Sequence, residues 1–369
     1  MTTIILLLAV FWLAYSNGAN DNFKGVATLY GSATASYKKA LLWATIATAA
    51  GSLVSVVAAN ELLAVFSGKG LVPQSLVGTP ELLIAVGIAS AITVFLATWL
   101  GLPTSTTHAL IGALLGVAVV ISPAGLSWGT VVDKLAGPLL LSPAIAIGMA
   151  AVLYLALRRL RLATGITKQT CVCLGSQAPQ LVHIQPDGAA VLASSGLSVS
   201  VGQMDNCVER YQGQFVGVDA QTSVDAVHYL SAGAVCFSRA VNDTPKIAAL
   251  LLAAPAGNTS WGLVLVATTM VLGGVLNSRR VAETMSKRIT DLNPGQGLTA
   301  NLVTALLVLL ASPLGLPVST THVSCGSIFG VGLVNRTFQW KTVAQILMAW
   351  VTTLPLAAIM SGLLFWLAM

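Results

Sequence analysis

The chain has 369 residues, of which 56% are hydrophobic and only 8% are charged. Because soluble domains carry about 25% charged residues, this composition and a mean hydropathy of +0.84 indicate a polytopic membrane protein. The net charge of +6 does not indicate nucleic-acid binding, since the basic residues stand at the ends of apolar runs, where membrane orientation explains them. The first residues lack a basic region and a cleavage motif, so we expect a retained membrane segment and not a signal peptide.

Apolar runs of membrane-spanning length fall into two sets of five, which predicts an all-α polytopic membrane protein. The first set covers about 3–36 (interrupted), 40–60, 81–101, 104–122 and 138–158, and the second about 226–254 (interrupted), 259–277, 297–313, 318–334 and 343–367. Five crossings is an odd number, so the second set must enter the membrane from the opposite side. The sequence therefore predicts two inverted-topology repeats, residues 1–160 and 226–369, with broken helices or re-entrant hairpins.

Residues 161–225, between the repeats, differ in character from both of them. They carry charges, the turn signal Pro186-Asp187-Gly188, and short alternating runs at Val191-Leu192 and Leu197–Val201. These features predict a small, partly β, aqueous insert.

The cysteines of the insert leave two interpretations open. The chain has five cysteines, an odd number without a disulfide framework. Cys171-x-Cys173, with Cys207 and His183, could form a metal or redox site. The C-x-C spacing is not the usual C-x-x-C of such sites, so we favour ordinary reduced thiols.

The basic residues predict the orientation of the chain. With the N-terminus outside, the outer loops receive only Lys69 and Lys134. The inner loops receive thirteen basic residues: Lys38, Lys39, Arg158, Arg159, Arg161, Lys168, Arg210, Arg279, Arg280, Lys287, Arg288, Arg336 and Lys341. This bias predicts a multi-pass protein of the cell (inner) membrane, with both termini outside and the insert in the cytosol. A cytosolic insert also agrees with free cysteines.

One polar motif occurs in both repeats, at an offset of 222 residues. Its two copies are Asn20-Asp21-x-x-Lys24 and Asn242-Asp243-x-x-Lys246. An ionisable residue within a membrane segment is costly and indicates function by default, and the spacing puts Asp and Lys on one helix face. Gly18 and Pro245 mark places where the helix could break. The alternative is a buried Asp–Lys pair that only holds helices together.

A second motif is duplicated at an offset of 214 residues, as Gly101–His108 and Gly315–His322. Its hydroxyl groups are those of Ser105, Thr106 and Thr107, and of Ser319, Thr320 and Thr321. A proline followed by serine and threonine is typical of a helix start, and a helix N-terminus can bind an anion. The hydroxyls could equally bind a cation such as sodium, or only cap the helices. The segments beside each motif could be full spans or a re-entrant hairpin.

His108 and His322 end the two copies of this motif. Neither has a carboxylate or a second histidine at ligand spacing, so we do not expect a zinc site. We expect both imidazoles to hold the hydroxyl-rich loops by hydrogen bonds, with titration near neutral pH as the alternative.

At these residues the chain resembles the PiT family of inorganic phosphate transporters. The resemblance rests on Gly18-Ala19-Asn20-Asp21, Asn242-Asp243, Pro103–His108 and Pro317–His322, and on the run from Arg280 to Thr290. It covers both membrane halves but not the insert. It implies an inverted-repeat α-helical fold, often dimeric, that carries inorganic phosphate with sodium or protons.

The resemblance also implies roles for individual residues. In that family the Asn-Asp and Ser-Thr elements line the phosphate and cation sites. We therefore expect a substrate and ion site formed by Asn20, Asp21, Lys24, Ser105, Thr106, Thr107, His108, Asn242, Asp243, Lys246, Ser319, Thr320, Thr321 and His322. Lys24 and Lys246 depart from the family pattern, which has small or neutral residues there in many members, and so leave the coupling ion open.

The sequence thus predicts a secondary active transporter that imports inorganic phosphate by ion-coupled alternating access at a central site. The alternatives are a transporter of another oxyanion such as sulfate, or an anion channel. We do not expect an enzyme, because catalysis needs an acid–base or metal constellation and only two aspartates and two histidines lie near the predicted core. We expect no cofactor beyond the coupling proton or sodium, and no ATP drive, because a G-x-x-x-x-G-K-[ST] motif is missing from the sequence.

Overall fold

The computed structural model describes residues 2–58, 66–69, 71–121, 129, 131–132, 137–176, 180–184, 190–193, 196–253, 259–311 and 318–368. The chain divides into two compact units. The first, a helical unit, comprises Met1–Tyr154 and His228–Met369, and the second, the insert unit, comprises Leu155–Val227.

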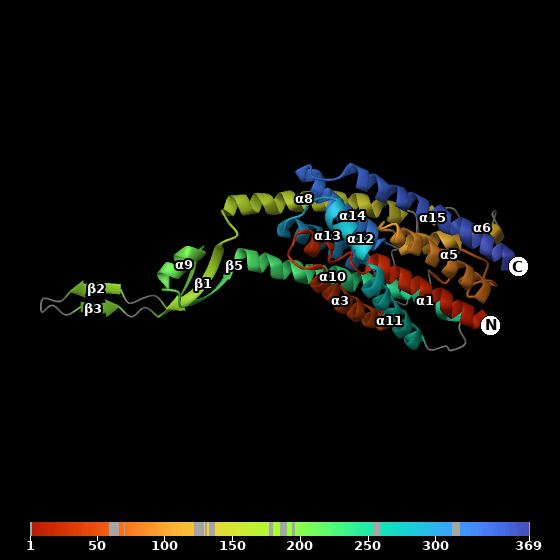
Figure 1. Cartoon of the computed structure of the whole chain (residues 1–369), viewed down its shortest axis with the longest axis horizontal. Coiled ribbons are helices and arrows are strands. Elements are labelled where there is room, and N and C mark those ends of the chain that lie inside the picture. Colours follow the sequence, from red (N-terminus) through yellow and green to blue (C-terminus); the bar gives the residue numbers. More distant parts are fainter. Residues whose placement is uncertain are drawn as a thin grey trace. The chain divides into compact units, whose positions relative to one another are not determined.

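Each of the ten predicted membrane segments coincides with helix (Figure 1). In the described part of the first half, the helices are α1 (Thr2–Asp21), α2 (Ala27–Gly31), α3 (Tyr37–Ala58), α5 (Pro80–Trp99), α6 (Thr106–Ile121) and α8 (Gly137–Thr164). Those of the second half are α10 (Ala220–Ala248), the 3-10 helix η3 (Ala249–Ala253), α11 (Thr259–Asn277), α12 (Arg279–Glu283), the π-helix η4 (Thr284–Arg288), α13 (Pro294–Ala311), α14 (Thr320–Asn335) and α15 (Trp340–Ala368).

Among the described helices, α1, α5, α8, α13 and α15 are long and apolar enough to cross a membrane. The pair formed by α11 and the helix after it is bent by 65° and would make a sixth span. By contrast, α6 and α14 have 16 residues each. At about 1.5 Å per residue such a helix is about 24 Å long, which is shorter than the hydrocarbon core of about 30 Å. Of the two segments beside each hydroxyl motif, the one before it (α5 or α13) is therefore long enough for a full span and the one after it (α6 or α14) is shorter.

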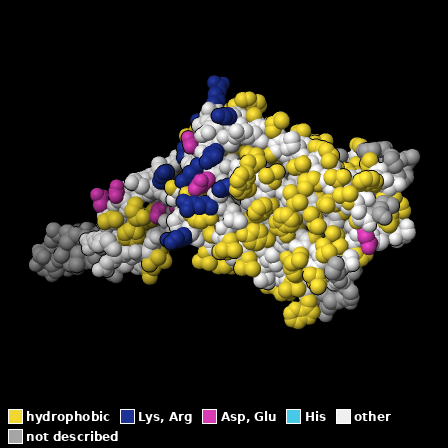
Figure 2. Space-filling view, turned by 45° about the vertical axis from the view of Figure 1, so that its right-hand side comes forward, with side chains coloured by type: hydrophobic (Ala, Val, Ile, Leu, Met, Phe, Trp, Pro, Cys, Tyr) yellow, Lys and Arg dark blue, Asp and Glu magenta, His cyan; other side chains and the backbone are white. Residues whose placement is uncertain are grey.

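The outer surface of the helical unit is apolar. Side chains such as Leu140 (72% exposed), Ile359 (70%) and Val351 (70%) face outward. Figure 2 shows hydrophobic side chains spread over the viewed face, with Lys and Arg side chains gathered beside this expanse. A water-facing surface rarely carries so large an apolar area, so this surface fits contact with lipid.

The sequence suggested helix breaks at Gly18 and Pro245, but the helices do not break there. Helix α1 continues through Gly18 to Asp21, and α10 continues through Pro245 to Ala248 before it tightens into η3. At Gly18 glycine serves close packing: a Cβ there would lie 1.8 Å from the carbonyl oxygen of Met270 in α11. Pro245 is buried within α10, whose last residue lies three positions further on.

The two halves pack in a reciprocal way. Helix α6 lies against α15, where a Cβ on Gly112 would lie 2.3 Å from the Leu354 carbonyl oxygen. Helix α14 lies against α8, where a Cβ on Gly330 would lie 2.4 Å from the Ile147 carbonyl oxygen. The short helix of each half therefore packs on the last helix of the other half. This exchange brings the N-termini of α6 and α14 towards α1 and α10.

The insert unit contains the predicted β-structure. Strands β1 (Thr170–Ser176), β4 (Leu197–Gln203) and β5 (Phe215–Asp219) form an antiparallel sheet in the order β4-β1-β5. Strand β2 (Gln180–Ile184) pairs with β3 (Ala190–Ala193), and helix α9 (Met204–Arg210) follows β4. The alternating runs at 191–192 and 197–201 are strands, as predicted, whereas the predicted turn at 186–188 lies outside the described residues.

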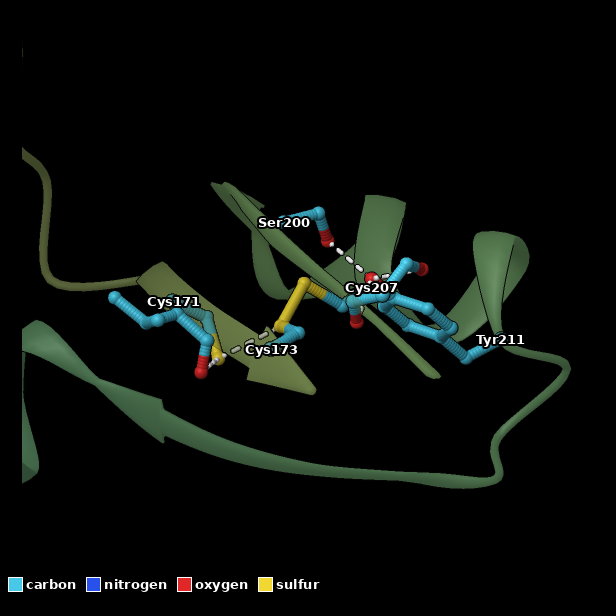
Figure 3. The surroundings of a disulfide bond; sticks show 7 residues. Cys171, Cys173, Ser200, Cys207 and Tyr211 are labelled. Atoms are coloured by element: carbon cyan, nitrogen blue, oxygen red, sulfur yellow. Dashed lines mark hydrogen bonds between the residues drawn. A yellow bond between two sulfur atoms is a disulfide. The ribbon is translucent and has the colours of Figure 1, made fainter. Parts of the chain in front are cut away.

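The prediction of reduced thiols throughout the insert is wrong. Cys173 on β1 and Cys207 on α9 form a disulfide, and Cys171 is free (Figure 3). The bonded cysteines are 34 positions apart in the chain, so the sequence alone does not indicate that α9 packs on β1. The side chain of His183, on β2, lies outside the described part of the chain.

Candidate substrate site

Two acid–lysine pairs lie at the centre of the helical unit, as their spacing predicted. Lys24 Nζ contacts Asp21 Oδ1 in the first pair, and Lys246 Nζ lies 3.6 Å from Asp243 Oδ1 in the second. All four side chains are at most 4% exposed. A buried charge is stable only where it is paired and hydrogen-bonded. These two pairs therefore depend on the hydrogen-bonding groups around them.

Arg239, which the sequence analysis left out of the site, is fully buried beside these pairs. Its guanidinium donates to Asn17 Oδ1 (3.1 Å) and to Thr48 Oγ1 (2.9 Å), and lies 3.9 Å from Asp243 Oδ2. Together with Lys24 and Lys246 it sets three cationic groups against two carboxylates, a formal charge of +1. The cluster is therefore suited to an anion.

Asn17 was missed as well, although it connects both acids. Its amide nitrogen lies 3.2 Å from Asp21 Oδ2, 3.3 Å from Asp243 Oδ2 and 2.9 Å from Thr106 Oγ1. A signal for both missed residues exists in the sequence. Arg239 stands 222 residues after Asn17, which is the offset of the duplicated Asn–Asp motif, and each stands four residues before its aspartate.

Each lysine reaches a threonine of the opposite half, and Lys24 also contacts Thr104 of its own half. Lys24 donates to the Thr104 carbonyl oxygen (2.9 Å) and to Thr321 Oγ1, and Lys246 donates to Thr107 Oγ1 (2.8 Å). Thr107 and Thr321 occupy the same position in the two copies of the hydroxyl motif. The contacts of the lysines are thus reciprocal between the halves.

Each hydroxyl motif begins a helix, and its serine caps that helix. Ser105 Oγ accepts a hydrogen bond from the His108 backbone N–H (3.1 Å), and Ser319 Oγ accepts one from His322 N–H (3.3 Å). The helix starts predicted from the two motifs are therefore the N-termini of α6 and α14. Pro103 precedes α6 by three residues, while residues 312–317, which include Pro317, lie outside the described chain. Thr320 is buried in the first turn of α14.

Asn20 and Asn242 hold the loops that lead into these helices. Asn20 donates to the Leu102 carbonyl oxygen (3.1 Å) and accepts from the Thr104 N–H (3.0 Å). Asn242 donates to the Val318 carbonyl oxygen (3.3 Å). Their side chains thus position the hydroxyl motifs, while Asp and Lys occupy the centre.

The imidazoles of His108 and His322 stack on each other, with ring centroids 4.3 Å apart. In the sequence neither histidine has another at ligand spacing, so this stacking was not predicted. His322 Nδ1 lies 2.6 Å from Ser319 Oγ, so this imidazole holds the loop as expected, whereas His108 Nδ1 has no partner among the described atoms. Among the described residues, the three side chains close enough to hold a metal ion together are cysteines of the insert. The histidine pair therefore has no third ligand in the described part of the chain.

The charged cluster is buried, and the two histidines, whose motifs contribute hydroxyls to it, line a cavity. This cavity of about 640 Å³ is lined by apolar side chains of α8, α14 and α15, with His108 and His322 in its wall. Trp350 packs on His322 at 3.8 Å between ring centroids. The stacked histidines and Trp350 thus form part of the wall of this cavity.

The fold and this site define a polytopic membrane transporter. The chain matches the Phosphate transporter family over residues 17–361, and it belongs to that family. The resemblance seen in the sequence is therefore confirmed. Its relatives are transporters, so the expectation that the chain is not an enzyme is confirmed too.

Curated relatives are similar over nearly the whole chain. A Rhizobium meliloti protein named "Probable low-affinity inorganic phosphate transporter" is 28% identical, covering 98% of this chain and 95% of its own length. "Inorganic phosphate transporter 2-1, chloroplastic" of Arabidopsis thaliana is 24% identical, covering 98% of this chain and 71% of its own length. Among solved structures, "The sodium-dependent phosphate transporter" matches with a TM-score of 0.72 at 21% identity, over 100% of this chain and 98% of that one. This likeness shows the fold.

Proposed function

We propose that the chain imports inorganic phosphate across the cell membrane by ion-coupled alternating access. The observation that carries the proposal is the buried cluster in which acid–lysine pairs and helix N-termini from both halves meet. The relatives named as phosphate transporters support phosphate as the substrate.

The chemistry of the cluster suits a tetrahedral oxyanion. The N-termini of α6 and α14 present backbone N–H groups and the positive ends of two helix dipoles. The hydroxyls of Thr106 and Thr107 can donate to phosphate oxygens, and the buried guanidinium of Arg239 adds a positive charge. We propose these groups, with the remaining predicted site residues, as the phosphate and ion site.

The reciprocal contacts support inverted repeats. Equivalent residues of the two halves touch each other: His108 stacks on His322, and Arg239 donates to Asn17. Such pairs are expected next to a two-fold axis that relates the repeats. Because all four acid and lysine side chains are closed off from solvent, phosphate can bind only after the halves move. We therefore propose alternating access, and disfavour an open anion channel.

We propose coupling to protons, with the lysines in place of sodium. The Lys24 ammonium is surrounded by Asp21 Oδ1, the Thr104 carbonyl oxygen and Thr321 Oγ1. Carboxylate, carbonyl and hydroxyl oxygens are hard ligands suited to a hard cation. A tethered ammonium that fills such a position supplies the positive charge without a free ion.

We propose that both termini lie outside and the insert in the cytosol. The thirteen-to-two distribution of basic residues supports this. The ammonium of Lys287 lies 4.4 Å from the ring centroid of Tyr30, and the guanidinium of Arg279 lies 5.9 Å from that of Tyr37. The basic segment at 279–288 therefore lies beside the one at 38–39, which follows Tyr37. The two termini lie at the same end of the helical unit (Figure 1).

Competition in proteoliposomes tests the substrate. Purified protein is reconstituted, and uptake of labelled phosphate is measured against excess unlabelled sulfate, with Asp243→Asn protein as the matched control. The proposal expects uptake that requires Asp243 and is unaffected by sulfate. Equal inhibition by sulfate and by unlabelled phosphate would establish the sulfate alternative.

A further inference from the structure

Three sulfur atoms meet in the core of the insert unit, which is a separate unit from the one that holds the candidate transport site. Cys171 Sγ lies 3.0 Å from Cys173 Sγ, which is bonded to Cys207. All three sulfur atoms lie within 4.8 Å of one another. Figure 3 shows Cys171 and Cys173 side by side on β1, with Cys207 approaching from α9.

The local structure explains why the sulfurs converge. Residues two apart on a strand point to the same face of the sheet, so Cys171 and Cys173 both face α9. Cys207 lies in the middle of that helix, and all three side chains are at most 1% exposed. Tyr211 completes this small cluster, with Met204 and Phe215 packed against it.

A disulfide alone does not account for this arrangement. It uses Cys173 and Cys207 but leaves a third buried sulfur, that of Cys171, in contact with it. In a reducing compartment a dithiol reductant supplies two electrons and two protons, which break the S–S bond and leave two thiols. The reduced insert then holds three thiols within reach of one ion.

We propose that the reduced insert binds a thiophilic metal ion through the sulfurs of Cys171, Cys173 and Cys207. Each thiol loses its proton as its sulfur ligates the metal. Thiolate and thioether sulfur selects Cu(I) or Zn(II). The three potential ligands that meet within 4.8 Å are all sulfur atoms, and structural zinc takes four ligands. Three sulfurs with Met204 packed beside them therefore fit Cu(I) better than Zn(II).

The site is independent of phosphate transport and of the charged cluster, so it is tested on its own. The full-length protein is purified in detergent and reduced without oxygen by a phosphine. It is then titrated with Cu(I) against a coloured Cu(I) chelator, and in a parallel arm with Zn(II). We expect one equivalent of metal to be retained per chain by the reduced protein, and none by the oxidised protein, whose disulfide occupies two of the sulfurs.

Two variants separate this site from other thiols. Cys171→Ser should weaken metal retention at least about tenfold, since even the loss of an outer-shell partner weakens metal sites about 10–100-fold. Cys236→Ser, which removes a buried free thiol of α10, should retain metal as the wild type does. Retention of Zn(II) with the same dependence on Cys171 would support the site and assign it to zinc.

The proposal is overturned if the reduced wild-type protein retains neither ion more tightly than Cys171→Ser does. It is also overturned if Cys236→Ser loses the metal as readily. The comparison of reduced and oxidised wild-type protein needs no variant, so it remains decisive if Cys171→Ser fails to fold.

Discussion

Substitution of Lys246 by methionine tests whether a lysine stands in for a coupling cation. The change keeps an apolar stem of similar length and removes the ammonium, which lies 3.6 Å from Asp243 and 2.8 Å from Thr107 Oγ1. The formal charge of the cluster falls from +1 to 0. Two unit charges about 4 Å apart interact by about 4 kcal/mol at an effective dielectric constant of about 20.

That energy corresponds to roughly a thousandfold in affinity for an anion at this distance. We therefore expect Lys246→Met to raise the apparent KM for phosphate by two to three orders of magnitude in sodium-free buffer, on the order of this energy. Sodium should restore part of the uptake, because the Asp243 carboxylate and the Thr107 hydroxyl would be left as ligands for it. The wild type should show no such response.

The assay is phosphate uptake into proteoliposomes at fixed pH, with sodium replaced by choline. Lys341→Met is the matched control, because it removes the same charge from an exposed position and should leave the KM unchanged. The reasoning is refuted if Lys246→Met transports phosphate without sodium at the wild-type KM. A wild type that stops transporting in choline would also refute it.

Asp21→Asn and Asp243→Asn should each abolish phosphate uptake while the protein remains folded in the membrane, since an amide cannot balance the buried cations; near wild-type uptake in either variant would make that acid structural. Ser105→Ala and Ser319→Ala should raise the apparent KM about ten- to hundredfold if each hydroxyl donates to a charged ligand, worth about 1.5–3 kcal/mol, and unchanged kinetics would leave them as caps only. A single cysteine introduced near position 185 should resist an impermeant thiol reagent added outside intact cells, and its labelling would reverse the proposed orientation.

The positions of the helices could be predicted from the sequence because the apolar runs are long and bounded by polar residues. The start of α6 at Thr106 follows from Ser105, whose hydroxyl caps the helix as its sequence position suggests. The predicted breaks at Gly18 and Pro245 precede the observed ends of α1 and α10 by three residues each. Gly18 is needed for close packing on α11, a contact that the local sequence does not reveal.

The site was predictable only where it is duplicated. Asp21 and Asp243 were found because their motifs are alike, whereas Asn17 and Arg239 differ in type although they occupy equivalent positions. An arginine in an apolar segment can reach outward to the interface, so composition did not place Arg239 at the centre. The disulfide of the insert depends on contact between distant segments, which a single sequence does not reveal.

Uptake under separately imposed ion gradients tests the central claim most directly. Purified protein in liposomes is given labelled phosphate with an inward proton gradient and no sodium, or with an inward sodium gradient and no pH difference. The account predicts phosphate accumulation above equilibrium with the proton gradient alone. Accumulation that requires sodium, or passive equilibration that no gradient drives, would contradict it.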